Sequence, residues 1–251
     1  MNGCETNEDL TDANNLDGVI AKNYKCRNEV QKKLSHSTLI DIIPKKNFIE
    51  LRVHDRLKLH NKTVIEFPGA QFGSYMHDCI SYILKEEYMV NTSKCTPLMI
   101  WEPSPTFQKL GLGGYRDNDD MMDKTICYDF RKIVVGGFRS KFKKVVVSPV
   151  LISDEMGMYG YGDLLCDGMV VDIKCYLSGA NILGWNNYLQ LLIYSAIYGC
   201  NETMCIYDPL KGVFHMMKLG GNDLVLLKQN INDVVESLCS QQKQEKVESK
   251  F

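Results

Sequence analysis

The segment from Tyr159 to Tyr194 contains two runs in succession, YGYGDLLCDGMVVDIKC and WNNYLQLLIY. The first run predicts a β-hairpin with strands over Gly160–Cys166 and Met169–Cys175, because the Asp167-Gly168 dipeptide between them is typical of tight hairpin turns. The second run lies in a predicted helix, residues 183–199, whose apolar residues recur at helical spacing. The segment therefore predicts a hairpin followed by a helix.

Three charged residues of the hairpin are expected to meet near one end of a sheet. Side chains alternate between the two faces of a strand, so Asp172 and Lys174 share one face, and closure of the hairpin brings Asp163 toward them. Two carboxylates held close together repel each other unless one is protonated or a cation is bound, and oxygen ligands of this kind suit Mg²⁺ or Mn²⁺. Taken alone, Asp163 is better explained as a strand-end or turn aspartate, and Lys174 as a solvated edge-strand lysine. Together they favour a metal-dependent site for phosphodiester hydrolysis.

The order of these residues resembles the PD-(D/E)XK nuclease superfamily. The elements of the resemblance are Gly160-x-x-Asp163, then Asp172-Ile173-Lys174, then Gln190-x-x-x-Tyr194. More narrowly, the pattern resembles the RecB-like branch, which includes the mitochondrial genome-maintenance exonuclease type. The match covers roughly residues 159–199, and the Asp-x-Lys element alone is a weak signal.

The resemblance implies a fold and a set of roles. The implied fold is an α/β or α+β domain in which helices flank a central mixed β-sheet, the restriction-endonuclease-like core. Asp163, Asp172 and the backbone carbonyl of Ile173 would bind one or two Mg²⁺ or Mn²⁺ ions, and Lys174 would assist the attacking water. Gln190 and Tyr194 would contact DNA or the catalytic lysine.

A histidine in the first strong helix is a further candidate ligand. The helix is predicted over Ala70–Met89, and His77 follows Gly73 by four residues, a placement that the RecB-like resemblance associates with a second metal or with shaping of the site. Helical periodicity by itself favours a partly buried histidine that bonds a backbone carbonyl. Asp78 is a weaker alternative, because it is expected to point to another face.

One position departs from the RecB-like pattern. Residues 144–152 predict a β-branched strand that Pro149 interrupts. Many RecB-like nucleases carry a glutamate on this strand, whereas this chain offers Ser148. A supporting role at the site is therefore in question, although the two aspartates are present.

A compact basic run precedes that strand. Arg139, Lys141, Lys143 and Lys144 form the run, and Phe138 and Phe142 are interleaved with them. Such a pattern is typical of a surface that contacts phosphates and stacks on a base, and equally of a solvated strand edge or loop.

The composition is that of an ordinary globular domain. The chain has 251 residues, 45% hydrophobic and 24% charged, with a formal net charge of −2 that weighs against tight non-specific binding of long duplexes. We expect no signal peptide, no membrane span and an intracellular location, in the cytoplasm, the nucleus or a viral factory. The ten cysteines have no framework spacing, so we expect reduced thiols, with Cys79, Cys166, Cys175 and Cys205 as small buried hydrophobes and no iron–sulfur cluster.

The predicted organisation is one domain with polar ends. Residues 1–16 are expected to be disordered, 17–240 to form a single nuclease-like domain with its core in 70–240, and 241–251 to form a polar tail. Further strands are predicted over residues 48–53, 63–67, 97–101, 204–207 and 212–219, further helices over 121–135 and 223–239, and a loop over 102–120.

The expected function is that of a metal-dependent DNA nuclease, an exonuclease in replication, repair or recombination. Its partner would be DNA, as a single strand or as duplex ends, with a possible protein partner bound through the termini. Two alternatives stay open. One is a catalytically degenerate nuclease fold that serves nucleic-acid binding or assembly, and the other is a nuclease that acts on RNA.

Overall fold

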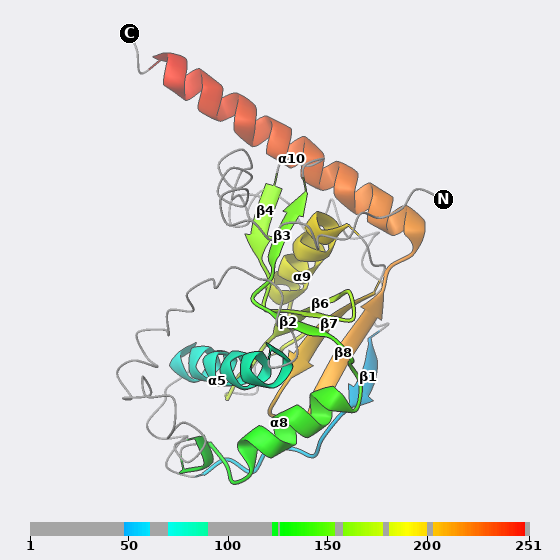
Figure 1. The fold of residues 1–251 in the computed structure, drawn as a ribbon. Helices are drawn as coiled ribbons and strands as arrows, with labels where there is room; N and C mark the ends of the chain where they lie inside the picture. Colours follow the sequence, from blue (N-terminus) through cyan, green and yellow to red (C-terminus); the bar gives the residue numbers. More distant parts are fainter. Residues whose placement is uncertain are drawn as a thin grey trace.

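A central sheet with helices on both faces forms the described part of the chain (Figure 1). The computed structural model describes residues 48–60, 70–89, 122–124, 126–153, 158–177, 181–199 and 203–248. Its strands are β1 (Ile49–Arg52), β2 (Val145–Val147), β3 (Val150–Ser153), β4 (Met158–Tyr161), β5 (Leu164–Cys166), β6 (Met169–Ile173), β7 (Thr203–Asp208) and β8 (Val213–Lys218). Its helices are α5 (Ala70–Met89), α8 (Phe130–Arg139), α9 (Trp185–Tyr198) and α10 (Gly221–Glu248). Within these residues no helix is both long and apolar enough to cross a bilayer.

The main sheet is mixed, as expected. Its six strands follow the order β1-β8-β7-β6-β5-β2, and β3 and β4 form a separate two-stranded sheet. Only β6 and β7 pair in parallel, and α9 provides the crossover between them, as parallel pairing requires. The prediction of a central mixed sheet flanked by helices is therefore confirmed.

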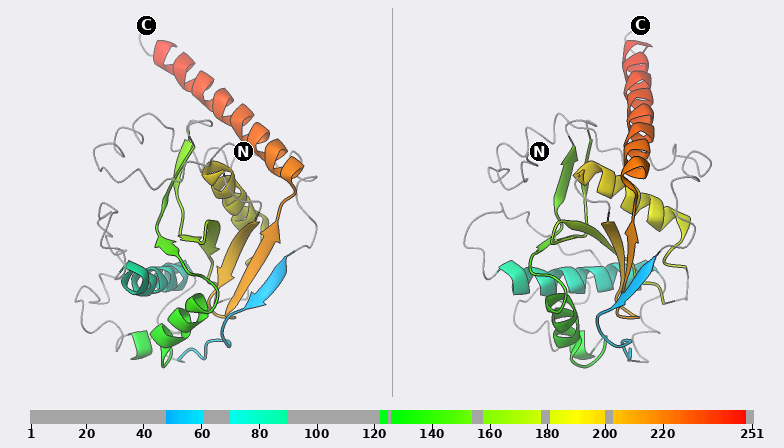
Figure 2. Two further views of the ribbon diagram at one scale, coloured as in Figure 1. Left: turned by 45° about the vertical axis from the view of Figure 1, so that its right-hand side comes forward. Right: turned by 90° about the vertical axis from the view of Figure 1, so that its right-hand side faces the viewer.

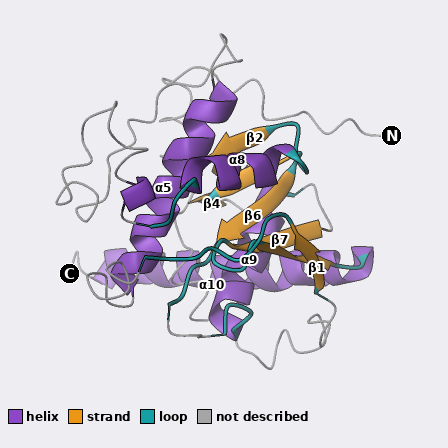
Figure 3. Cartoon of the chain, turned by 90° about the horizontal axis from the view of Figure 1, so that it is seen from below, coloured by secondary structure: helices purple, strands orange, loops and turns teal. Residues whose placement is uncertain are grey.

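Two apolar clusters lie on opposite faces of this sheet. One cluster packs α5 and α8, which contact each other, against the sheet, and the other packs α9 and α10 (Figures 2 and 3). Alternate residues of β6 enter different clusters, since Val171 and Ile173 face α5 and α8 whereas Val170 faces α9. This alternation places Asp172 on the α9 face.

The tight turn of the predicted hairpin is confirmed. Asp167 and Gly168 both have positive φ, 46° and 82°, as a two-residue turn of this hand requires, and β5 pairs with β6 on either side of it. The Asp167 carboxylate also accepts hydrogen bonds from the backbone N–H groups of Lys143 and Lys144, at 3.1 and 2.7 Å. The turn thereby holds the start of β2 against the hairpin.

The first strand of the hairpin is not continuous. The predicted strand Gly160–Cys166 divides into β4 and β5, which belong to different sheets, because the paired strand bends at the same level. Ser148 has a φ of 52°, and its N–H donates to the carbonyl of Asp163 at 2.8 Å, while the N–H of Gly162 donates to the carbonyl of Pro149 at 3.0 Å. The two strands thus remain paired through the bend, and Asp163 lies in it.

Two helix boundaries differ from expectation. The predicted helix 121–135 is confirmed only in part: residues 122–124 and 130–135 are helical, but residues 126–129 are not, and α8 continues from Phe130 through Gly136 and Gly137 to Arg139. A glycine costs about 1 kcal/mol in a helix, but the buried face of α8 outweighs this cost, and a side chain at Gly137 would meet the ring of His54 at 3.2 Å. In addition, α10 continues to Glu248, nine residues past the predicted end at Cys239. The predicted strands over 63–67 and 97–101, the loop over 102–120 and the segment 1–16 lie outside the described residues.

Candidate functional site

A lysine, an aspartate and a glutamine join β6 to α9. Lys174 Nζ lies 2.7 Å from Asp172 Oδ2 and donates to Gln190 Oε1 at 3.3 Å, and Gln190 Nε2 donates to Asp172 Oδ1 at 3.1 Å. The three groups form a closed triangle. Only 1% of Asp172 is exposed, so its charge is held inside the protein and not at the surface.

The second aspartate is fixed by the hairpin and by α5. Asp163 Oδ2 accepts a hydrogen bond from the backbone N–H of Ile173 at 2.8 Å, across the two strands. Its other oxygen, Oδ1, lies 3.2 Å from His77 Nε2. The bend between β4 and β5, the end of β6 and the helix α5 therefore meet at this carboxylate.

The two carboxylates ionise very differently. Burial alone would raise the pKa of Asp163, but the hydrogen bond and charge of His77, the charge of Lys174 and the N–H of Ile173 outweigh it and lower that pKa to about 2. For Asp172, burial and the charge of Asp163 outweigh the attraction of Lys174 and raise the pKa to about 7. The negative charge of Asp163 is thus fully offset by its neighbours, whereas Lys174 offsets that of Asp172 only in part.

Two cations face these carboxylates. Burial tends to lower the pKa of His77, but Asp163 and Asp78 raise it to about 10, and Asp78 Oδ1 lies 3.6 Å from His77 Nδ1. Burial likewise opposes the charge of Lys174, yet Asp172 and Asp163 raise its pKa above the usual value. At neutral pH the site therefore holds opposite charges in close contact.

The donor set fits a hard divalent cation. Asp172 Oδ2 and His77 Nε2 are buried, and each faces a group of opposite charge: Lys174 Nζ lies 2.7 Å from Asp172 Oδ2, and Asp163 Oδ1 lies 3.2 Å from His77 Nε2. Carboxylate oxygens suit Mg²⁺ and Mn²⁺, and an imidazole nitrogen suits Mn²⁺. Among the described residues no three His, Cys, Asp or Glu side chains already converge as a metal-binding group. Asp163 and Asp172 are the residues that would hold the ion, with His77 and the carbonyl of Ile173 beside them.

The helix α5 can reach the site because of a glycine. A side chain at Gly73 would bring its Cβ to 3.0 Å from the backbone carbonyl oxygen of Cys175, immediately after Lys174. The absence of a side chain at Gly73 lets α5 approach the end of β6 and places His77, one turn along, over Asp163. Residues 73 and 77 are therefore coupled through the packing of α5.

Gly73→Ala is expected to destabilise the protein, whereas Gly136→Ala is expected to stabilise it. The first change forces a methyl group against a backbone carbonyl, and the second replaces an exposed helical glycine with open space around it. The free energy of unfolding is expected to fall by about 1–3 kcal/mol in Gly73→Ala and to rise by about 0.5–1 kcal/mol in Gly136→Ala. Urea denaturation of both variants measures them, and a Gly73→Ala protein as stable as Gly136→Ala would contradict the close packing of α5.

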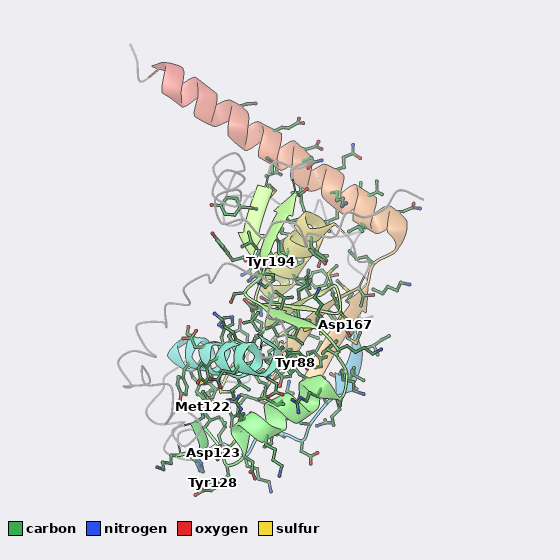
Figure 4. All side chains as sticks on the ribbon, in the orientation of Figure 1. Tyr88, Met122, Asp123, Tyr128, Asp167 and Tyr194 are labelled. Atoms are coloured by element: carbon green, nitrogen blue, oxygen red, sulfur yellow. The ribbon has the colours of Figure 1, made fainter. Side chains whose placement is uncertain are left out.

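Tyr194 takes a different position from Gln190. It lies one turn further along α9, is 2% exposed, and its ring would be 3.0 Å from a Cβ placed on Gly160 of β4 (Figure 4). Gln190 bonds both Lys174 and Asp172 directly. Tyr194 packs α9 against β4 of the β3–β4 ribbon, close to the bend that contains Asp163.

The basic run lies at the far end of β2 from Asp163. Arg139, Lys141, Lys143 and Lys144 are exposed, and Arg139 forms an ion pair with Glu87 of α5. Of the two interpretations of this run, base stacking is ruled out for Phe138, which has no exposed surface. Phe138 is fully buried and Phe142 is half-buried, and both pack on Phe214, because their side chains face the core while the basic ones face outward.

The four cysteines predicted as small buried hydrophobes are buried and unoxidised. Burial raises the pKa of each of these thiols above its usual value, so they are poor nucleophiles. They are Cys79, Cys166, Cys175 and Cys205, and Cys127 is a fifth. Trp185 packs at the edge of the α9 cluster.

Sequence analysis did not identify two supports of the site. The carbonyl of Tyr207 accepts a hydrogen bond from the N–H of Lys174 at 3.0 Å, which continues the parallel pairing of β6 and β7 by one residue. Asp78, 8% exposed, flanks His77 although the helical pattern placed it on another face. The strand–helix–strand order around α9 is a signal for the first contact, and no sequence pattern indicates the second.

The metal-free protein is expected to lose stability from pH 4 to pH 7, and Asp172→Asn is expected to reduce this loss. The pKa of Asp172 is raised to about 7, so in this window the native state holds a proton that the unfolded state has released. Stability from this group is therefore present at low pH and falls as the pH rises toward 7. The difference between the two proteins should reach about 2 kcal/mol or more near pH 7.

Thermal unfolding in EDTA across this range checks the prediction, since the other titrating groups are common to both proteins. Parallel stability curves for the wild type and the variant would contradict the raised pKa of Asp172.

The described site thus joins β6, the β4–β5 bend, α5 and α9 through Asp172, Asp163, His77 and Gln190, with Lys174 at the centre. Comparisons of the chain with protein-family models, with curated proteins and with solved structures find no match.

Proposed function

We propose that this protein is a metal-dependent nuclease that hydrolyses phosphodiester bonds in DNA, with Asp163, Asp172 and Lys174 as its catalytic group. The observation that carries the proposal is the contact of Lys174 with Asp172 beside a second aspartate that the same hairpin holds in place. The sequence resemblance to RecB-like PD-(D/E)XK nucleases supports the same assignment.

The electrostatics of the site support metal-assisted chemistry. Asp172 is buried beside Asp163, and their mutual repulsion raises the pKa of Asp172 to about 7. A carboxylate held in this way gains stability when a cation binds. A divalent cation, when bound, would supply Lewis-acid stabilisation of the scissile phosphate.

The residues of the chain have separable tasks in this proposal. Lys174 carries a positive charge at the site, where it orients the attacking water and stabilises the negative charge that develops on the phosphate. Gln190 positions both side chains: its Oε1 accepts a hydrogen bond from Lys174, and its Nε2 donates one to Asp172. His77 holds Asp163 from the side of α5 and is a further ligand or proton carrier.

The exposed basic run offers a place for the rest of the substrate. Its lysines lie at the opposite end of β2 from the bend, about 10–15 Å from Asp163 at 3.3 Å per residue. Phosphates of a bound strand would contact them without sequence preference. Because the net charge of the chain is −2, its overall electrostatic field does not attract DNA, and attraction of the substrate depends on this local basic run.

A binding or assembly module with a degenerate site is the second candidate. Two observations favour it: Lys174 and His77 already pair with both aspartates, and Ser148 lies beside Asp163 where many RecB-like nucleases have a glutamate. Such a module has no need of a divalent cation.

Calorimetric titration with Mn²⁺ tests the proposal against this second candidate. The wild type is expected to bind Mn²⁺ and to cleave a labelled oligonucleotide only when the ion is present. Binding of nucleic acid without either property would reject the nuclease and retain the module.

A further inference from the structure

The face of β4 that points away from α9 carries two tyrosines. Met158 belongs to the α9 cluster, and a Cβ on Gly160 would meet the ring of Tyr194, so these alternate positions face α9. Tyr159 and Tyr161 therefore lie on the opposite face. In the left-hand view of Figure 2, α9 lies to the right of the β3–β4 ribbon and α5 lies below it on the left, so this face looks out over the side of α5.

The two rings support each other outside the main apolar clusters. Their centroids are 5.9 Å apart and the rings are nearly perpendicular, at 88°. Tyr159 is 9% exposed and belongs to neither apolar cluster, and Tyr161 is half-buried. Tyr159 thus supports the ring of Tyr161, while part of the Tyr161 side chain remains accessible.

The tyrosines are continuous with the candidate site. Tyr161 is the last residue of β4, and Asp163 follows two residues later in the bend, at most about 7 Å away along the chain. The chain between them is fixed by the hydrogen bond from Gly162 to the carbonyl of Pro149. A group bound at Asp163 therefore lies within one side-chain length of the Tyr161 ring.

We propose that Tyr161, supported by Tyr159, is a stacking platform for an unpaired base next to the phosphate held at Asp163. The preferred substrate is accordingly a single strand or a frayed end. The proposal deepens the proposed nuclease function and rests on it. A base inside a duplex has both faces covered by its neighbours, whereas an unpaired base offers a free face to an aromatic ring. A stacking contact accepts any base, so the platform selects strand state and not sequence.

Fluorescence anisotropy in EDTA tests the platform without cleavage. The full chain and its Tyr161→Ala, Tyr161→Phe and Tyr128→Ala variants are titrated into a labelled single strand, the same strand with abasic terminal positions, and a blunt duplex. Tyr128 is the matched control, because it is 74% exposed and lies at the bottom of the view in Figure 4, well below Tyr194.

Tyr161→Ala is expected to weaken binding of the single strand by about 5- to 150-fold, as loss of one base–aromatic stack does. Tyr161→Phe and Tyr128→Ala are expected to bind like the wild type, and binding of the abasic strand by the wild type is expected to fall by a similar factor. With Mn²⁺ present, the same loss should appear in the KM for a single strand and leave kcat less affected.

Equal binding of normal and abasic strands by the wild type would overturn the platform, and this comparison needs no variant that folds. Loss of binding in Tyr161→Phe equal to that in Tyr161→Ala would also overturn it, because the ring is retained. Metal-dependent cleavage with unchanged Tyr161→Ala binding would reject the platform alone. A wild type that neither binds nor cleaves any nucleic acid would reject the proposed function together with it.

Discussion

Asp172→Asn is expected to lower metal-dependent cleavage by about 10²- to 10³-fold or more, with the fold intact. The substitution keeps the shape of the side chain. It also keeps an oxygen that can accept the hydrogen bond from Gln190, which is 3.1 Å long in the native protein. It removes the charge that would hold a divalent cation beside Asp163.

The measurement is the initial rate of cleavage of an end-labelled oligonucleotide in Mn²⁺, together with a thermal melt. Gln190→Ala is the matched comparison: it removes a positioning side chain and no ligand, so its loss should be much smaller. A rate for Asp172→Asn close to that of the wild type would contradict the assignment of this carboxylate.

Lys174→Ala is expected to have two large effects, a loss of cleavage and a loss of stability, because Lys174 is proposed both to act in catalysis and to neutralise Asp172. Cleavage should fall by about 10²- to 10³-fold, because the charge that stabilises the reacting phosphate is lost. At pH 8 in EDTA the free energy of unfolding should fall by about 3–5 kcal/mol, because the ionised Asp172 carboxylate is left buried without its cation. The loss should be smaller at pH 5, where Asp172, with a pKa of about 7, is protonated.

Metal affinity separates this account from a purely structural ion pair. Without the Lys174 ammonium group, Asp172 should bind Mn²⁺ at least as tightly as in the wild type, and Mn²⁺ should restore much of the lost stability. Arg131→Ala, which breaks an ion pair with Glu86 at the surface, should cost no more than about 1 kcal/mol and leave cleavage unchanged. A Lys174→Ala protein that cleaves normally, or whose stability Mn²⁺ does not restore, would contradict the role of Lys174.

Local signals in the sequence predicted the parts of the fold that depend on local physics. The Asp167-Gly168 turn was predictable because only residues that tolerate positive φ fit a two-residue hairpin loop. The helix α5 matches its predicted bounds because its apolar residues recur at helical spacing through its whole length. The contact between Lys174 and Asp172 follows from the alternation of strand side chains.

Other parts depend on tertiary packing and were not predictable from local patterns. The division of the predicted strand into β4 and β5 depends on the bend at Ser148, a residue with no intrinsic preference for positive φ. Two adjacent glycines in α8 suggested a helix end, but the packing of Gly137 against His54 retains the helix. Phe142 was expected at the surface with its charged neighbours, yet its ring packs on Phe214, which is distant in the sequence.

The assay that tests the central claim most directly offers the purified protein and its Lys174→Ala variant a set of labelled substrates. These are linear single-stranded DNA, linear duplex DNA, a closed circle and an RNA, each with Mg²⁺, Mn²⁺ or EDTA. The account predicts metal-dependent loss of linear DNA, with single strands preferred, and no such loss in the variant or in EDTA. No cleavage of any substrate under any of these conditions, or equal cleavage by the variant, would contradict the claim that Asp163, Asp172 and Lys174 form a nuclease site.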